Sequence, residues 1–130
     1  MIEDVVDQVI RFRDERNWKQ FHNPKDLAIS ISLEAAELLE NFQWTGSEMD
    51  VPEKRISIVE ELADVLIYSI MMANTLQVDV SEIIKEKLKN NGKKYQVEQA
   101  YGSKKKYTEL GKWHDYLSEQ CTWISDGRWW

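Results

Sequence analysis

Two pairs of carboxylates in this 130-residue sequence have the spacing of metal ligands on a helix, Glu34/Glu37 and Glu61/Asp64. Residues three apart on an α-helix project from the same face, so each pair offers two oxygen ligands to one ion. Mg²⁺ and Mn²⁺ prefer carboxylate oxygens and retain bound water, which suits phosphate chemistry. The same spacing recurs elsewhere in this acidic chain, so the surroundings of each pair decide what it indicates.

Glu61 and Asp64 share one strip with Tyr68 on a stretch that is otherwise apolar on almost every side of a helix. We expect these two carboxylates to be largely desolvated, which is costly unless they are paired with cations or bind a metal ion. Lys54 and Arg55 lie a full turn or more before Glu61, and neither acidic helix carries a matching set of basic residues. Metal binding is therefore the better explanation for this pair.

Glu34 lies beside the apolar stripe of the other acidic helix, and Glu37 lies about one-sixth of a turn further round. This pair borders a polar seam that solvent and substrate can reach. Two acidic pairs that face each other within a helical bundle form a carboxylate metal site. We therefore predict one site that contains Glu34, Glu37, Glu61 and Asp64.

Helical periodicity of apolar residues runs through most of the chain, and signals for β-strands are nearly absent. Asn23 is expected to cap a helix with Pro24 at its first position, and Asp79 with Glu82 forms a capping box for another. The pattern predicts an all-α, four-helix bundle in which the third helix is central. The expected helices cover residues 3–16, 24–43, 52–76 and 79 to about 90–92.

The bulk composition disfavours several classes of protein. Hydrophobic residues make up 42% and charged residues 31%, as in soluble globular proteins, and the formal charge of −6 disfavours a general nucleic-acid binder. The longest apolar stretch, Val65–Ala73, is too short to cross a bilayer, so no membrane association is expected. The lone Cys121, with no secretory leader at Met1–Asp4, predicts a cytoplasmic location.

The chain changes character after Gly92. Lysines and tyrosines are frequent among residues 93–107, and residues 113–130 hold four of the six tryptophans. We expect one domain over residues 1–110 and an irregular, tryptophan-rich extension over residues 111–130. The extension shows no clean period, and an oligomer contact, a flap over a site and a loosely ordered tail all remain open for it.

Several short motifs follow one another in order between Trp18 and Leu110. They are Asn17-Trp18-Lys19-Gln20-Phe21-His22, Glu34-Ala35-Ala36-Glu37, Phe42-Gln43-Trp44, the run from Glu60 to Tyr68, Asn91 with Lys94-Tyr95, and Gly102-Ser103 before Lys106-Tyr107. Together they resemble the MazG-type all-α nucleotide pyrophosphohydrolases, in particular the short, single-domain branch that includes the mammalian dCTP pyrophosphatase. Gln96 stands where that family usually has a proline, which bears on the path of the following chain.

The resemblance implies hydrolysis of a nucleoside triphosphate, dCTP or a related deoxynucleotide, to the monophosphate and pyrophosphate, in a house-cleaning or pool-regulating role. It implies Mg²⁺, with Mn²⁺ as a substitute, on the four carboxylates, and a homodimer or homotetramer. We expect Glu34 or Glu37 to act on the attacking water. The resemblance places Trp18, His22, Trp44 and Tyr68 at the base and sugar, and Asn91, Lys94 and Tyr95 at the nucleotide or its phosphates.

Two other classes of function compete with this interpretation. The first is a non-catalytic nucleotide-binding or regulatory helical oligomer of the same fold, which would bind nucleotide without turnover. The second is a di-iron carboxylate bundle, which normally requires Glu-x-x-His pairs. His22 and His114 lie on neither acidic helix, and this disfavours the di-iron class.

Overall fold

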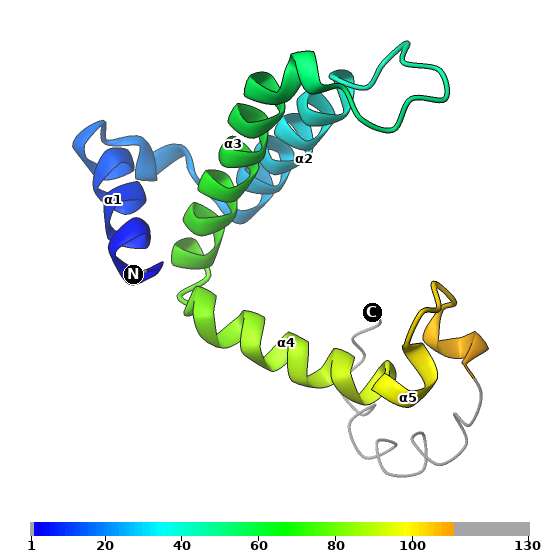
Figure 1. Ribbon diagram of the computed structural model, residues 1–130. Coiled ribbons are helices and arrows are strands. Elements are labelled where there is room, and N and C mark those ends of the chain that lie inside the picture. The colour runs from blue at the N-terminus through cyan, green and yellow to red at the C-terminus, as the bar shows by residue number, and fades with distance from the viewer. Residues whose placement is uncertain (1, 111–130) are drawn as a thin grey trace. The chain divides into compact units, whose positions relative to one another are not determined.

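The computed structural model describes residues 2–110, which form helices and turns without any strand (Figure 1). The predicted all-α fold is thereby confirmed. The contacts divide the chain after Ile84 into two compact units, and helix α4 (Val80–Lys94) crosses the division. The extension predicted for residues 111–130 lies outside the described residues, and the predicted domain boundary at residue 110 stays a prediction.

A hairpin of two antiparallel helices, α2 (Pro24–Glu40) and α3 (Arg55–Thr75), dominates the first unit and carries the acidic residues (Figure 1). Asn23 caps α2 as predicted, because its side-chain oxygen accepts a hydrogen bond from the Asp26 amide at 2.9 Å. The helix ends three residues before the predicted end, and a series of turns follows. The 3₁₀ turn η2 (Pro52–Lys54) leads directly into α3.

Helix α1 (Ile2–Glu15) packs against α3, and the 3₁₀ turn η1 (Trp18–Phe21) connects it to α2. The contact includes Arg13, whose side chain is only 1% exposed. Its Nη1 donates to Asn74 Oδ1 at 2.8 Å, and its Nη2 forms an ion pair with Asp14 Oδ1 at 2.7 Å. Because these contacts provide partners for its guanidinium group, the arginine can be buried between the two helices.

The apolar core of the first unit is small. Leu27, Val51, Met71 and Ala73 are its buried hydrophobic residues. Helix α3 contacts both α1 and α2, which agrees with its predicted central place, but the helices of this unit cover only part of its apolar surface. Ile56, Val59, Leu62 and Leu66 of α3 are each close to half exposed or more. The expectation that Glu61 and Asp64 are largely desolvated is therefore wrong, since neither residue is buried in this structure.

Helix α4 begins where the sequence predicted but continues further. Asp79 Oδ1 accepts a hydrogen bond from the Glu82 amide at 2.8 Å, which confirms the cap on this side. The predicted end at residues 90–92 is wrong, because the helix passes through Gly92 and ends at Lys94. The Tyr95 amide still donates to the Asn91 carbonyl at 2.8 Å, and a single glycine weakens a helix without stopping it.

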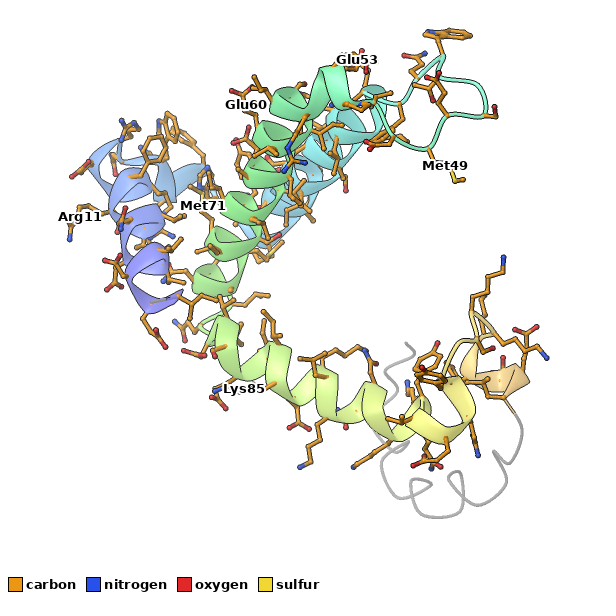
Figure 2. All side chains as sticks on the ribbon, in the orientation of Figure 1. Arg11, Met49, Glu53, Glu60, Met71 and Lys85 are labelled. Carbon is orange, nitrogen blue, oxygen red and sulfur yellow. The ribbon has the colours of Figure 1, made fainter. Side chains whose placement is uncertain are left out.

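The second unit continues after α4 with two short helical turns, α5 (Val97–Ala100) and η3 (Tyr107–Glu109), which the sequence did not predict. Exposed side chains line much of the chain's surface, among them Lys85 at the start of this unit and Met49 in the α2–α3 connection (Figure 2). Among the described residues, no helix is both long enough and apolar enough to pass through a membrane.

Candidate active site

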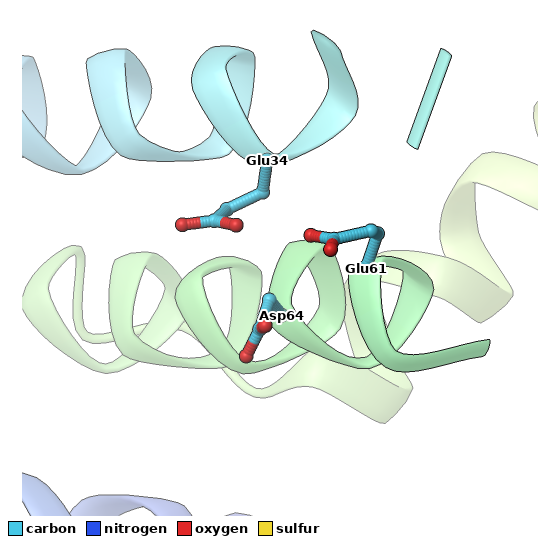
Figure 3. A group of neighbouring side chains, drawn as sticks. All are labelled: Glu34, Glu61 and Asp64. Carbon is cyan, nitrogen blue, oxygen red and sulfur yellow. The ribbon is translucent and has the colours of Figure 1, made fainter. Parts of the chain in front are cut away.

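Three carboxylates from the two antiparallel helices converge between α2 and α3. One oxygen atom from each of Glu34, Glu61 and Asp64 lies within 4.8 Å of the other two. Figure 3 shows Glu34 reaching from α2 toward α3, where Glu61 and Asp64 stand one turn apart. Helix geometry places Glu61 and Asp64 on one face, and the antiparallel packing brings Glu34 opposite them.

In the described part of the chain, no cationic side chain forms an ion pair with the three carboxylates, and none of the three forms a side-chain hydrogen bond. Partial burial raises the pKa of Glu34 above its usual value, and the charges of Glu37, Asp64 and Glu61 raise it further. The pKa of Glu61 is raised for the same reasons, first by loss of solvent and then by its acidic neighbours, Glu37 foremost. Repulsion among the ionised groups therefore favours binding of a cation.

The donor set fits a hard divalent ion. All three groups offer carboxylate oxygens, the ligands that Mg²⁺ and Mn²⁺ prefer. Mg²⁺ holds its ligands at about 2.1 Å, so oxygens on opposite sides of the ion are about 4.2 Å apart. The three oxygens lie within 4.8 Å of one another, so they are close enough together for one ion to lie among them.

Glu37, the fourth predicted ligand, does not belong to this group of three among the described residues. It lies nearby, since its charge raises the pKa of both Glu34 and Glu61. It also lines a hollow together with Glu61. The structure thus places Glu37 beside the three convergent carboxylates, and its role as a ligand stays a prediction.

A row of aromatic rings extends from α1 to α3 and includes three of the residues predicted for the base pocket. The Trp18 and His22 rings are 6.5 Å apart between centroids, and the His22 and Tyr68 rings are 6.3 Å apart, both edge to face. Phe12, which the sequence did not single out, continues the row at 5.8 Å from Trp18. Tyr68 follows Asp64 by four residues on α3, so the row leads toward the carboxylates.

His22 is the polar member of this row. Its Nδ1 is buried and has no hydrogen-bond partner among the described residues. Loss of solvent, and then the charge of Arg13, lower the pKa of this imidazole below 6.5. The lowered pKa favours the neutral ring, and each nitrogen of a neutral imidazole either donates or accepts one hydrogen bond.

Trp44, the fourth residue predicted for the base pocket, stands apart from this row. Its side chain is 92% exposed, and its φ of 68° places the backbone in the left-handed region that non-glycine residues rarely adopt. The tryptophan lies in the turns after α2, beyond the end of the helix. Its predicted contact with the base remains a prediction.

Asn91, Lys94 and Tyr95 belong to the second unit, at the end of α4. In this unit, Tyr107 contacts both Lys94 and Tyr95. The Tyr107 ring lies edge to face with Tyr95 at 5.8 Å, and the Lys94 ammonium lies 5.2 Å from its centroid. Such a contact between a cation and a ring orients the lysine. The predicted role of these residues at the phosphates remains a prediction.

Lys54 lies closer to the acidic residues than its sequence position suggested. It lines a hollow of about 220 Å³ with Glu37, Glu40, Asn41, Ser57 and Glu61. The spacing offered a signal, because Lys54, Ser57 and Glu61 recur at three and four residues and so share one face. From the sequence, the lysine was not expected to pair with Glu61, because it lies a full turn or more before that residue.

Comparison with known protein families identifies the family of this chain. A model of the MazG-like family matches residues 29–110, which include both acidic pairs. The chain belongs to the MazG-like family. The family prediction made from the ordered motifs is thereby confirmed.

Named relatives agree with this membership. The chain is 37% identical to human dCTP pyrophosphatase 1 over 123 residues, which cover 91% of this chain and 71% of that protein. It is 37% identical to the mouse dCTP pyrophosphatase 1 over 114 residues, covering 84% and 67%. A crystal structure of a pyrophosphatase from Archaeoglobus fulgidus superposes with a TM-score of 0.61 at 37% identity, covering 73% of this chain and 92% of that one.

The predicted enzyme class follows from this membership. As a MazG-like protein with these relatives, the chain is a nucleoside triphosphate pyrophosphohydrolase. The three carboxylates between α2 and α3 could hold a metal ion. The structural likeness also agrees with the predicted MazG-like helical fold.

Proposed function

We propose that this chain hydrolyses a deoxynucleoside triphosphate, with dCTP as the first candidate, to the monophosphate and pyrophosphate in a Mg²⁺-dependent reaction. The observation that supports it best is the convergence of Glu34, Glu61 and Asp64 without any cationic partner among the described residues. The relatives named dCTP pyrophosphatase 1 supply the candidate substrate. Removal of such a triphosphate suits a house-cleaning or pool-regulating role.

Glu34, Glu61 and Asp64 would hold the metal ion in this proposal. Bound Mg²⁺ would neutralise charge on the phosphate oxygens and so favour attack at the α-phosphorus. Mn²⁺ has the same ligand preference and would serve as a substitute. The raised pKa values of Glu34 and Glu61 support the assignment, because a cation relieves the repulsion that raises them.

Glu37 would be the general base, because it lies beside the three ligands without joining them. It accepts a proton from water as the water oxygen forms a bond to the α-phosphorus. The bond between the α-phosphorus and the bridging oxygen breaks, and its electron pair leaves with pyrophosphate. Glu37 then carries the proton until solvent removes it.

The aromatic row would hold the nucleoside. Trp18 is 41% exposed, so its ring offers a face on which a base can stack. Neutral His22, whose Nδ1 lacks a partner among the described residues, would exchange a hydrogen bond with the base edge. Tyr68 is the member of this row on α3, four residues after Asp64, where the sugar would be expected. The family resemblance also implies substrate roles for Trp44 and, in the second unit, for Asn91, Lys94 and Tyr95.

The chain would work as a homodimer or homotetramer. An apolar hollow of about 520 Å³ on α2 is lined by Leu33, Ala36, Leu39 and Phe42 together with three polar residues. Exposed apolar surface of this kind marks interaction sites, and the small core needs further burial. Leu33→Glu is expected to reduce the mass in sedimentation to that of one chain, whereas Met49→Glu in the α2–α3 connection leaves it unchanged. A monomeric wild-type protein would overturn this assignment.

The reaction is tested by incubating the protein with a panel of nucleoside triphosphates and Mg²⁺ and measuring pyrophosphate. We expect release from dCTP, none in EDTA, and at least a ~100-fold loss of rate in Glu61→Gln, since the metal loses a ligand. Full activity of Glu61→Gln would exclude the proposed site. Nucleotide binding without turnover by the wild type would instead favour the non-catalytic alternative.

A further inference from the structure

The hollow beside the three carboxylates differs from the carboxylate group itself because a cationic residue lines it. Its volume is about 220 Å³, and one lysine, Lys54, lines it among three glutamates, an asparagine and Ser57. Two of those glutamates, Glu37 and Glu61, also belong to the proposed catalytic group. The hollow is thus continuous with the reacting centre, and it holds a cation that the reaction as proposed above leaves without a role.

Lys54 has hydrogen-bonding capacity to spare. Its Nζ donates to the carbonyl oxygen of Asn41 at 2.9 Å, at the end of α2. An ammonium group has three donors, so this contact leaves two. Among the described residues the lysine forms no ion pair, and the Ser57 hydroxyl has no hydrogen-bond partner. Both side chains are partly buried, and with a metal ion offsetting the charge of the neighbouring glutamates, a phosphate would meet these donors.

One face of α3 carries the side chains of the proposed site in a fixed order along the helix. Ser57, Glu61, Asp64 and Tyr68 follow one another at intervals of four, three and four residues, which keeps them on a single strip. The strip is about 16 Å long at 1.5 Å per residue. The aromatic row meets it at Tyr68, the carboxylates occupy its middle, and the hollow with Lys54 opens at Ser57.

The order of the phosphates in the substrate then indicates which part of it would reach the hollow. In a nucleoside triphosphate the α-phosphorus lies between the nucleoside and the two terminal phosphates. With the nucleoside at the aromatic row and the α-phosphorus at the carboxylates, the β- and γ-phosphates extend toward Ser57. They reach the end of the strip where Lys54 offers a charge-assisted hydrogen bond.

We propose that Lys54 and Ser57 form the subsite for the β- and γ-phosphates, which also holds pyrophosphate before its release. The subsite rests on the proposed function above. A purely structural lysine, which only caps α2 at Asn41 and offsets the neighbouring glutamates, would affect stability without affecting pyrophosphate. Affinity for pyrophosphate therefore separates the two roles.

The test compares Lys54→Met, Lys54→Arg and the control Arg11→Met, whose side chain points outward from α1 (Figure 2). Pyrophosphate binding is measured by calorimetry with Mg²⁺, beside dCMP binding and the KM for dCTP. Lys54→Met is expected to weaken pyrophosphate binding and raise KM by about 10- to 100-fold, because a charged hydrogen bond is lost. It should leave dCMP binding within about twofold, and Lys54→Arg should retain most of the pyrophosphate affinity.

Pyrophosphate affinity within about twofold of wild type in a folded Lys54→Met protein would overturn the subsite. If that variant does not fold, Ser57→Ala provides the second measurement, with a loss of about fivefold expected for one neutral hydrogen bond. An unchanged affinity in Ser57→Ala would then overturn the proposal. A wild-type protein that binds pyrophosphate but turns over no triphosphate would refute the proposed reaction while leaving the subsite intact.

Discussion

The imidazole of His22 lies 6.3 Å from the ring of Tyr68, edge to face, and so connects the chain before α2 to the face of α3 that carries the acidic residues. The contact is reinforced at the backbone, where the Thr75 hydroxyl donates to the His22 carbonyl at 3.3 Å. The nucleoside end and the reacting end of the proposed site are therefore built on the same helix. Changes at His22 are expected to affect binding of the nucleoside more than the chemical step.

Replacement of His22 tests this separation. His22→Phe is expected to raise KM for dCTP by about tenfold, the effect of one hydrogen bond, with a smaller change in kcat. Arg11→Met, which changes an exposed side chain on α1, is the control and should change neither value. A large fall in kcat with KM unchanged would contradict a role for His22 in holding the base.

The lowered pKa of His22 predicts a dependence of stability on pH. Because the neutral form is favoured in the folded protein, its contribution is present above the ordinary pKa of 6.5 and is lost as the pH falls below it. The free energy of unfolding should therefore decline from pH 7 toward pH 5 more steeply in wild type than in His22→Phe. Titration of the imidazole by NMR should give a pKa below 6.5, and a value above it would refute the prediction.

The raised pKa values of Glu34 and Glu61 predict the opposite dependence when no metal is present. Their contribution to stability is complete below the ordinary pKa of 4.5 and is lost as the pH rises through the higher folded value. In EDTA, Glu61→Gln should thus have a higher denaturation midpoint than wild type at pH 8. Mg²⁺ should stabilise wild type but not this variant.

The matched control for that comparison is Glu53→Gln, which removes an exposed carboxylate from η2 (Figure 2). It should behave as wild type does in both EDTA and Mg²⁺. Equal stabilisation of wild type and Glu61→Gln by Mg²⁺ would show that the ion binds elsewhere.

Glu37→Gln distinguishes a base from a ligand. We expect kcat to fall by about 100- to 10,000-fold, the usual contribution of a general base, while Mg²⁺ affinity stays within about threefold. Glu34→Gln should lower both kcat and Mg²⁺ affinity. Glu48→Gln, in the α2–α3 connection, should change neither quantity. If Glu37→Gln weakens Mg²⁺ binding as much as Glu34→Gln does, Glu37 is the fourth ligand that the sequence predicted.

The buried Arg13 predicts a measurable cost when its partner is removed. Asn74→Ala leaves one guanidinium donor without its acceptor, which should lower the free energy of unfolding by about 1–3 kcal/mol. Gln8→Ala removes an exposed hydrogen bond to Asp4 on α1 and should cost less than about 0.5 kcal/mol. Urea denaturation measures both, and equal stabilities would contradict the importance of the contact between α1 and α3.

Much of the local structure was predictable because it depends on residues within one helical turn. Asn23 and Asp79 cap their helices as their side chains suggested, and Glu61 and Asp64 share a face because of their spacing. The end of α4 was misjudged, since Gly92 does not stop a helix whose hydrogen bonds continue to Tyr95. Propensity at one residue is a weak signal when its neighbours favour the helix.

Residue types at short spacing were enough to predict the helices, their acidic pairs and the family motifs. Which of these groups meet depends on how the helices pack. The packing of α2 against α3 brings Glu34 to Glu61 and Asp64, leaves Glu37 beside them, and opens the hollow in which Lys54 lies. These contacts join residues far apart in the chain, and they depend on the register of two packed helices, which spacing within either helix cannot specify.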